Sequence, residues 1–253
     1  MNIKIHSNFL NFESDLIKFI ENFNNQGTIF GDGKRNIIKI FDLNDKKVNI
    51  KSFKKPNFYN KIIYKFIRKS KAQRSYDYAN LLLKNKIGTP QPIAFIENFD
   101  LFGLNDSYYL SEHLTTELTF RELVQIPNYP DHENILRQFT RFCFDLHEKG
   151  IEFLDHSPGN TLIEKSTNGK YNFYLVDLNR MKFHEKMDFD TRMNNLRRLT
   201  PKQEMIAVMS NEYAKFYDKS EQEIFDNLWK KTSDFQYKYF RKLRLKKKLK
   251  FWK

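Results

Sequence analysis

The spacing of hydrophobic and polar residues in the first half of the chain predicts helices separated by short strands. SDLIKFIENF (14–23) begins with a serine cap and places apolar residues three or four apart, which predicts a helix. NIIKIFDL (36–43) and KKVNIKSF (46–53) are β-rich runs around a polar NDKK turn and predict a hairpin. A second helical run, residues 60–86, stops before IGTPQP, whose glycine and prolines end a helix. Two further strands are predicted in the segments PIAFIE and DSYYLSEHL, so the expected order is helix, two or three strands, helix, two strands.

The second half is mainly helical in its spacing. ENILRQFTRFCFDLHEKG (133–150) has a long helical run whose final Gly150 suits a left-handed cap. A strand, loop and strand follow within residues 153–181, and two helices are expected at about 188–218 and 220–245. A β-rich half joined to a helical half indicates an α+β, bilobal chain.

The change from strand-like to helical spacing of apolar residues predicts where one lobe ends and the next begins. Residues 1–114 are expected to form an N-lobe with an N-terminal helix, a five-stranded antiparallel sheet and one further helix. Residues 115–245 are expected to form a mainly helical C-lobe, and residues 246–253 a basic tail.

Composition narrows the class of protein. The chain has 253 residues, of which 40% are apolar and 30% charged, enough for a packed core. It contains no apolar run long enough to cross a membrane, and its start lacks a signal-peptide pattern, so a cytoplasmic location is expected. Cys143 is the only cysteine, which excludes a disulfide framework within one chain, and its helical position predicts a core residue.

The formal charge of +13 is concentrated in two patches. Residues 46–74 contain 11 Lys or Arg and no acid, and residues 238–253 contain nine and no acid. Such patches attract nucleic acid, anionic membranes or phosphorylated ligands, and charge alone does not choose among them. No zinc-finger spacing or RNA-recognition signature is present, so we expect no specific nucleic acid partner.

Three oxygen-bearing side chains stand at informative intervals in FLDHSPGNTLIEKSTNGKYNFYLVDLNRM. Asp155 precedes Asn160 by five residues, which is the D-x-x-x-x-N interval of a kinase catalytic loop. TLIE and NFYLVD predict a hairpin that returns Asp177 to the neighbourhood of Asn160. Phosphoryl transfer from ATP needs a carboxylate for the acceptor hydroxyl, and an amide and a second carboxylate for Mg²⁺. Asp155, Asn160 and Asp177 are therefore the candidate catalytic residues, and the last two the candidate metal ligands.

Candidate nucleotide-binding residues precede this segment. Lys51 in VNIK resembles the strand lysine that holds the α- and β-phosphates, and Asp77 is the only carboxylate between it and Gly88 that could pair with it. Gly31 and Gly33 could cover the nucleotide, although the protein-kinase G-x-G-x-x-G is not present. Glu112 lies in the segment expected to connect the lobes and to present backbone groups to adenine. These residues are expected to line one nucleotide-sized cleft together with the catalytic residues.

Several segments resemble the lipopolysaccharide core-sugar kinases, the Kdo and heptose kinase family. The resemblance covers about residues 26–185 and depends on GKRNIIKIF, VNIKSFKKPN, YKFIRKSKAQRSYDYANLLL, IGTPQPIAFIE, DSYYLSEHL and DHSPGN…LVDLNRM. It implies a protein-kinase-like fold, ATP and Mg²⁺ as cofactors, and the roles already given to Lys51, Asp77, Asp155, Asn160 and Asp177. Aspartate at 77 replaces the usual glutamate, and Leu-Asn replaces the Phe-Gly that follows the metal aspartate in protein kinases.

Each assignment has a structural alternative. Asp155 and Asn160 could be turn residues in a Pro-Gly loop, Lys51 a solvated lysine and Asp77 a surface acid. His147 is expected to pack or to hydrogen-bond the catalytic loop rather than to bind metal. The tail KYFRKLRLKKKLKFWK mixes cations with apolar residues, which favours an anionic membrane surface, although a solvated charge run would look similar.

The leading hypothesis is a kinase that phosphorylates a hydroxyl of a lipopolysaccharide inner-core sugar, Kdo or heptose, with ATP and Mg²⁺. Its partners would be the lipid-linked sugar and the inner face of the cytoplasmic membrane, where it would be peripheral. A protein kinase or small-molecule phosphotransferase would share the same active-site logic. A catalytically silent kinase-like module that binds anions through its basic patches is the third possibility.

Overall fold

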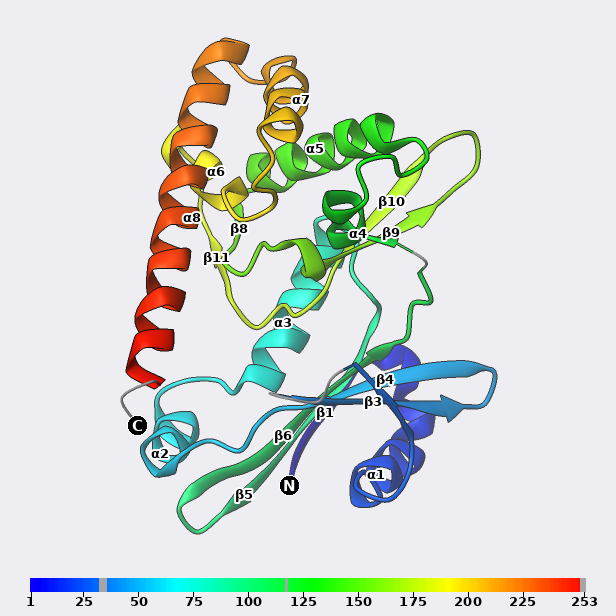
Figure 1. Cartoon of the computed structure of the whole chain (residues 1–253). Coiled ribbons are helices and arrows are strands. Elements are labelled where there is room, and N and C mark those ends of the chain that lie inside the picture. The colour runs from blue at the N-terminus through cyan, green and yellow to red at the C-terminus, as the bar shows by residue number, and fades with distance from the viewer. Residues whose placement is uncertain (32–35, 117, 251–253) are drawn as a thin grey trace. The chain divides into compact units, whose positions relative to one another are not determined.

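The structure, a computed structural model, describes residues 1–31, 36–116 and 118–250. It divides into two compact units. The first unit comprises Met1–Thr115 and the short segment Val176–Arg180, and the second comprises Thr116–Leu175 and Met181–Lys253. Figure 1 follows the chain through these elements from blue to red. The segment around Asp177 therefore belongs to the first unit, although the chain on both sides of it belongs to the second.

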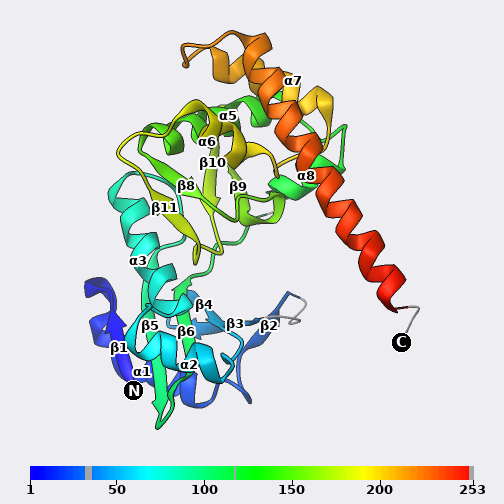
Figure 2. The same ribbon diagram turned by 90° about the vertical axis from the view of Figure 1, so that its left-hand side faces the viewer.

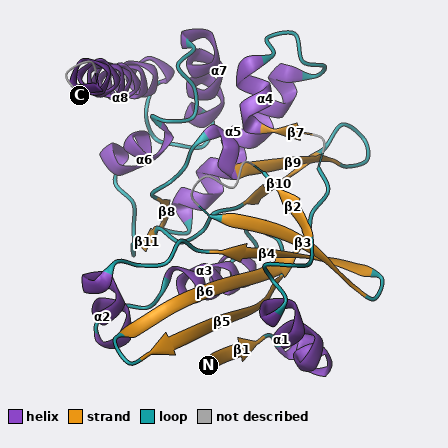
Figure 3. Cartoon of the chain, turned by 60° about the horizontal axis from the view of Figure 1, so that its bottom comes forward, coloured by secondary structure: helices purple, strands orange, loops and turns teal. Residues whose placement is uncertain are grey.

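An antiparallel sheet forms the centre of the first unit (Figure 3). Among the described residues it has six strands in the order β1-β5-β6-β4-β3-β2. One strand more is present than the sequence predicted, because the short segment β1 pairs with β5, with Ile3 opposite Ile96. The strands are β1 (Asn2–Ile5), β2 (Thr28–Phe30), β3 (Ile37–Leu43), β4 (Lys46–Ser52), β5 (Pro92–Asp100) and β6 (Gly103–Glu112).

The two faces of this sheet bury different helices. On one face, Val48 and Ile50 of β4 pack with Leu16 and Ile20 of α1 (Glu13–Glu21). Alternation along the strand places the next odd-numbered residues on the opposite face. There Phe53 joins Ala72, Tyr76 and Phe95 in a second core under α3 (Lys71–Lys84). Lys51 thus lies on the face that α3 covers.

The helix predicted over residues 60–86 is two helices. After β4, the chain passes through a short loop into α2 (Phe58–Phe66), and α3 begins only at Lys71. Ser70 caps α3 by accepting a hydrogen bond from the Gln73 N–H at 3.0 Å. A serine cap marks the start of a new helix. The spacing of apolar residues alone does not distinguish two successive helices from one continuous helix.

The second unit is built around the long helix α5, as the sequence predicted. Gly150 follows α5 with φ 67°, and a Cβ there would lie 1.9 Å from the His184 carbonyl oxygen, so only glycine fits. Cys143 is fully buried, and burial raises the pKa of its thiol well above the usual value, in agreement with a core role. Two small sheets, β10-β9-β7 and β11-β8, pack beside α5. The elements are β7 (Leu118–Thr119), α4 (Phe120–Gln125), α5 (His132–Glu148), β8 (Ile151–Phe153), β9 (Thr161–Lys165), β10 (Tyr171–Leu175), β11 (Met181–Phe183), α6 (Phe189–Leu196), α7 (Gln203–Ala214) and α8 (Glu221–Lys250).

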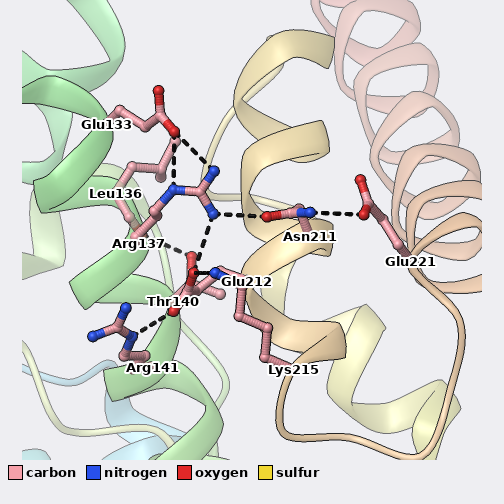
Figure 4. A network of polar contacts seen from close by, with 9 residues as sticks. All are labelled: Glu133, Leu136, Arg137, Thr140, Arg141, Asn211, Glu212, Lys215 and Glu221. Atoms are coloured by element: carbon pink, nitrogen blue, oxygen red, sulfur yellow. Dashed lines mark hydrogen bonds and ion pairs between the residues drawn. The ribbon is translucent and has the colours of Figure 1, made fainter.

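A buried carboxylate connects α5 to α7 (Figure 4). The Glu212 side chain has no exposed surface and accepts from Arg137, at 3.1 Å, from Arg141 and from Lys215, at 2.6 Å. Burial by itself would raise the pKa of Glu212, but these hydrogen bonds outweigh it and the pKa is lowered. A charged Glu212 therefore fixes the two helices against each other through its cationic partners.

The helices near the C-terminus differ in length from the prediction. The helix expected at 188–218 is interrupted between α6 and α7, where Pro201 removes a backbone donor. In contrast, α8 runs as one helix to Lys250, because no glycine or proline interrupts its lysine-rich end. Its first turns bury Ile224 and Leu228, and its second half is exposed and extends away from the other helices of this unit (Figure 2).

Candidate active site

A lysine and an aspartate far apart in sequence form the central ion pair of the first unit. The Lys51 Nζ atom lies 2.6 Å from the Asp177 Oδ1 atom, and only 12% of the lysine side chain is exposed. The same ammonium lies 5.4 Å from the ring centre of Phe53. Lys51 therefore has a fixed position on the α3 face of the sheet, next to a carboxylate that follows β10.

The backbone at Asp177 is unusual. Its φ is 61°, in the left-handed region that non-glycine residues seldom adopt and that Asp and Asn tolerate best. The Asn179 amide donates a hydrogen bond of 2.6 Å to the same Oδ1 atom that Lys51 contacts. Both donors thus bind one carboxylate oxygen, and Oδ2 has no hydrogen-bond partner among the described residues. This conformation agrees with a functional role for Asp177, and that role stays a prediction.

Asp77 lies on α3 and does not pair with Lys51 in this structure. Its Oδ2 atom accepts from Lys69 Nζ at 2.7 Å, and the carboxylate beside Lys51 is Asp177. The predicted Lys51–Asp77 pair is therefore replaced by two separate pairs. A physical reason is the short reach of the aspartate side chain, while Lys69 stands directly before the Ser70 cap, close to Asp77 in sequence.

The second unit places Asp155 and Asn160 in one compact loop. After β8, the chain passes Asp155 and forms a single 3-10 turn, η2 (Pro158–Asn160). The Asn160 Nδ2 atom donates to the Asp155 carbonyl oxygen at 2.8 Å, which closes the five-residue interval. Because the amide nitrogen is used in this bond, the Asn160 Oδ1 atom is left as the acceptor of the side chain.

Arg198 is a cationic neighbour of this loop that the sequence did not indicate. Its Nη1 atom lies 3.4 Å from the Asp155 Oδ1 atom and 3.3 Å from the Leu154 carbonyl oxygen. The contact with Leu154 holds the Arg198 guanidinium beside the loop, and the contact with Asp155 restricts the direction of its carboxylate. Arg198 follows α6, more than forty residues along the chain, so no local motif connects it with Asp155.

A series of buried, hydrogen-bonded side chains supports the same loop. Asn195 donates to the Phe153 carbonyl oxygen at 2.8 Å, and its Oδ1 atom accepts from His147 Nε2 and His156 Nδ1, both at 3.1 Å. The Tyr213 hydroxyl contacts the other ring nitrogen of His147 at 2.9 Å. Burial lowers the pKa of His147 to about 3 and of His156 to about 4, so both rings are neutral at pH 7. His147 thus holds the loop through Asn195.

The remaining predicted nucleotide-binding residues are placed as follows. Gly31 has φ 86°, so its backbone conformation favours glycine, and Gly33 lies outside the described residues. Glu112 ends β6, where its N–H donates to the Gln91 carbonyl and its carboxylate lies 2.5 Å from Lys46 Nζ. That hydrogen bond raises the pKa of Lys46. The roles of these residues toward a nucleotide stay predictions.

The structure brings the four main candidates together as two pairs. Lys51 and Asp177 meet in the first unit, and Asp155 and Asn160 meet in the second. Their gathering around one cleft stays a prediction. Asn179 could have been recognised from the sequence, because it stands two residues after the candidate metal ligand.

Each unit offers one side-chain oxygen of the kind that Mg²⁺ prefers, and their binding of one common ion stays a prediction. Asp177 offers its Oδ2 atom and Asn160 its Oδ1 atom, and oxygen is the ligand that Mg²⁺ prefers. Within the described residues, no three His, Cys, Asp or Glu side chains converge as a complete metal cage. Magnesium in phosphotransferases does not require one, since it commonly binds one or two protein side chains together with phosphates and water.

Comparisons with known proteins agree with this architecture. The structure matches that described as "WaaP in complex with acyl carrier protein" with a TM-score of 0.66, at 13% identity, over 95% of this chain and 99% of that chain. The fold is therefore a protein-kinase-like fold, as the sequence predicted. Residues 21–219 match the model of the lipopolysaccharide kinase (Kdo/WaaP) family, and the chain belongs to this family. It is a phosphotransferase with an alcohol group as acceptor. The search of curated proteins found no match.

Proposed function

We propose that the protein transfers the γ-phosphoryl group of ATP, in the presence of Mg²⁺, to a hydroxyl of an inner-core sugar of lipopolysaccharide, Kdo or heptose. The observation that carries this proposal is the ion pair of 2.6 Å between Lys51 and Asp177, which joins the predicted phosphate lysine to the predicted metal ligand. The left-handed conformation of Asp177 beside a lysine side chain that is only 12% exposed favours a working site over a silent module.

Each residue has a role in the proposed reaction. Lys51 binds the α- and β-phosphates, and Asp177 and Asn160 are the ligands of Mg²⁺, which neutralises charge on the transferring group when bound. Asp155 orients the acceptor hydroxyl and receives its proton as the oxygen attacks the γ-phosphorus, whose bond to the β–γ bridging oxygen breaks so that ADP leaves. Arg198 keeps the Asp155 carboxylate in place through its contact of 3.4 Å.

The proposed place of action is the inner face of the cytoplasmic membrane. None of the described helices combines the length and the apolar composition that crossing a bilayer requires. The second half of α8 exposes Tyr239, Phe240 and Leu243 among its lysines and arginines. A mixed basic and apolar helix of this kind favours an anionic membrane surface, where lipid-linked sugars reside.

A carrier protein is a second candidate partner. The WaaP structure contains acyl carrier protein, and the basic surfaces of this chain could bind an acidic protein of that kind.

A phosphate-transfer assay tests the proposed function. The wild-type protein is incubated with radiolabelled ATP, Mg²⁺ and one of three acceptors: core lipid, a mixture of proteins, or an aminoglycoside. We expect label on core lipid only, and mass spectrometry of the product identifies the sugar and the hydroxyl.

The variant Asp155→Asn should bind MgATP with unchanged affinity and transfer no label, because the amide cannot accept the proton. Label on proteins or aminoglycosides in place of core lipid would assign a different acceptor. Transfer by Asp155→Asn at the wild-type rate would remove Asp155 from the mechanism.

A further inference from the structure

The helix α2 exposes an apolar stripe in the first unit. None of its side chains is buried. Tyr59, Ile62 and Phe66 follow one another at helical spacing on one face, and Ile67 extends this face past the last turn. Tyr59, Phe66 and Ile67 are each more than 70% exposed. Contiguous exposed apolar side chains of this size mark an interaction surface.

The turn between β5 and β6 lies against α2 (Figure 3), and Phe102 of this turn contacts Phe58 of the helix, with ring centres 6.0 Å apart. Leu101 is 90% exposed and Phe102 60% exposed at this turn. The Lys61 ammonium pairs with Asp100 at 2.5 Å. A Cβ at Gly103 would lie 2.4 Å from the Lys61 carbonyl oxygen, so the helix lies directly against the turn. We call Tyr59, Ile62, Phe66, Ile67, Leu101 and Phe102 the α2 face.

A basic cavity lies on the other side of the same helix. It has a volume of about 380 Å³, and Asn60 and Tyr64 of α2 line it together with lysines from the flanking segments. Lys54 and Lys55 form no ion pair with the described residues, and Lys71 is the third lysine of the lining. No acidic residue occurs anywhere between Lys46 and Arg74. The cavity therefore suits an anionic group such as a phosphate.

We propose that the α2 face docks the first unit onto an anionic lipid membrane, with its apolar side chains among the acyl chains and the nearby Lys54 and Lys55 at the level of the lipid phosphates. A membrane is favoured over nucleic acid because aliphatic side chains such as Ile67 and Leu101 have no role on a phosphate backbone. Charge of a single sign beside exposed aromatic residues is typical of interfacial helices that bind anionic lipid. This docking goes beyond the proposed reaction and does not depend on it.

An environment-sensitive probe tests the contact directly. Phe66→Cys in the full-length protein is labelled with a nitrobenzoxadiazole fluorophore, which the buried Cys143 does not take up. On adding vesicles that contain phosphatidylglycerol, we expect a blue shift and at least a twofold rise in emission, with quenching by doxyl groups on the acyl chains. Leu10→Cys, exposed elsewhere in the same unit, is the matched control and should not respond.

Substitutions separate the apolar and cationic contributions. Tyr59→Ser/Ile62→Ser/Phe66→Ser should weaken vesicle partitioning about tenfold. Lys54→Gln/Lys55→Gln should weaken binding to phosphatidylglycerol but not change the weak binding to phosphatidylcholine. Both variants should keep wild-type transfer to a water-soluble core oligosaccharide, so loss of docking is distinguishable from loss of catalysis.

Three outcomes would overturn the proposal. The probe at position 66 could remain unchanged on vesicles, or respond no more than the probe at position 10. It could also respond to purified acyl carrier protein and not to vesicles, which would assign the α2 face to an acidic protein.

Discussion

Asn195 is the residue that joins two buried histidines to the backbone directly before the Asp155 loop. Its amide satisfies three groups at once, two ring N–H groups and the Phe153 carbonyl oxygen. Nothing in the local sequence MNNLRRLT (193–200) indicates this role of Asn195, because its hydrogen-bond partners lie about forty residues away in sequence. Periodicity and motif spacing predict residues within one segment, and such a contact depends on how separate segments pack.

We therefore expect Asn195→Ala to affect catalysis and stability together. Three buried polar groups would lose their partner, which should lower the free energy of unfolding by about 2 kcal/mol or more. The kcat should fall at least about tenfold as the Asp155 loop loses its support, while the KM for ATP stays unchanged. Urea unfolding and steady-state kinetics measure the two effects. Asn211→Ala, in the more exposed network of α7, is the control and should leave kcat at the wild-type value.

The buried histidines predict a pH dependence of stability. Their pKa values in the folded protein, about 3 for His147 and about 4 for His156, lie below the ordinary value of 6.5. The unfolded chain therefore binds more protons below pH 6.5, and stability is present above that pH and lost as the pH falls toward 4 and 3. His156 Nε2 has no hydrogen-bond partner among the described residues, so a proton there would be buried without an acceptor.

Between pH 6 and pH 5, each histidine should contribute a slope approaching ~1.4 kcal/mol per pH unit. Urea unfolding of the wild type and of His147→Gln over this range measures it. The variant should show a shallower slope than the wild type. Equal slopes would mean that His147 is not held neutral by the fold.

At the scale of elements, sequence spacing predicted those segments whose signal is local. The hairpin of β3 and β4 around NDKK and the helix α5 with its Gly150 cap are both present. The separation of α2 from α3 and the continuation of α8 to Lys250 were missed. A capping residue decides where a helix begins or ends, but it does not change the spacing of apolar residues from which the helices were predicted. Val176–Arg180 belongs to the first unit, where Asp177 pairs with Lys51, and local spacing does not predict a tertiary contact of this kind.

The packing of α5 against α7 depends on Glu212, and its replacement should be costly. Glu212→Gln would leave Arg137, Arg141 and Lys215 close together without the charge that balances them. We expect a loss of about 3 kcal/mol in the free energy of unfolding, measured with urea. Glu133→Gln removes an exposed partner of Arg137 in the same network and should cost less than about 1 kcal/mol. Similar losses in the two variants would show that burial of Glu212 does not matter.

At the scale of the whole molecule, the charge of +13 is concentrated in two segments of the sequence, one around α2 and one in the second half of α8. Lys246→Gln/Lys247→Gln/Lys248→Gln should weaken binding to phosphatidylglycerol vesicles by roughly a hundredfold, since each of the three cations adds about 1 kcal/mol near an anionic surface. Lys18→Gln/Lys84→Gln/Lys86→Gln changes the net charge equally outside both segments. Sedimentation with vesicles should show wild-type binding for that control. An equal loss of binding in both variants would show that vesicle binding depends on net charge and not on the lysines of α8.

The central claim is that Lys51, Asp155, Asn160 and Asp177 serve one phosphotransfer site. A crystal structure with Mn²⁺ and a non-hydrolysable ATP analogue tests it most directly, because anomalous scattering locates the metal. We expect the metal within about 2.2 Å of the Asn160 Oδ1 atom and an Asp177 carboxylate oxygen. Lys51 should contact the α- and β-phosphates, and Asp155 should face the γ-phosphate. A nucleotide bound elsewhere, or a metal held without Asn160 and Asp177, would contradict the claim.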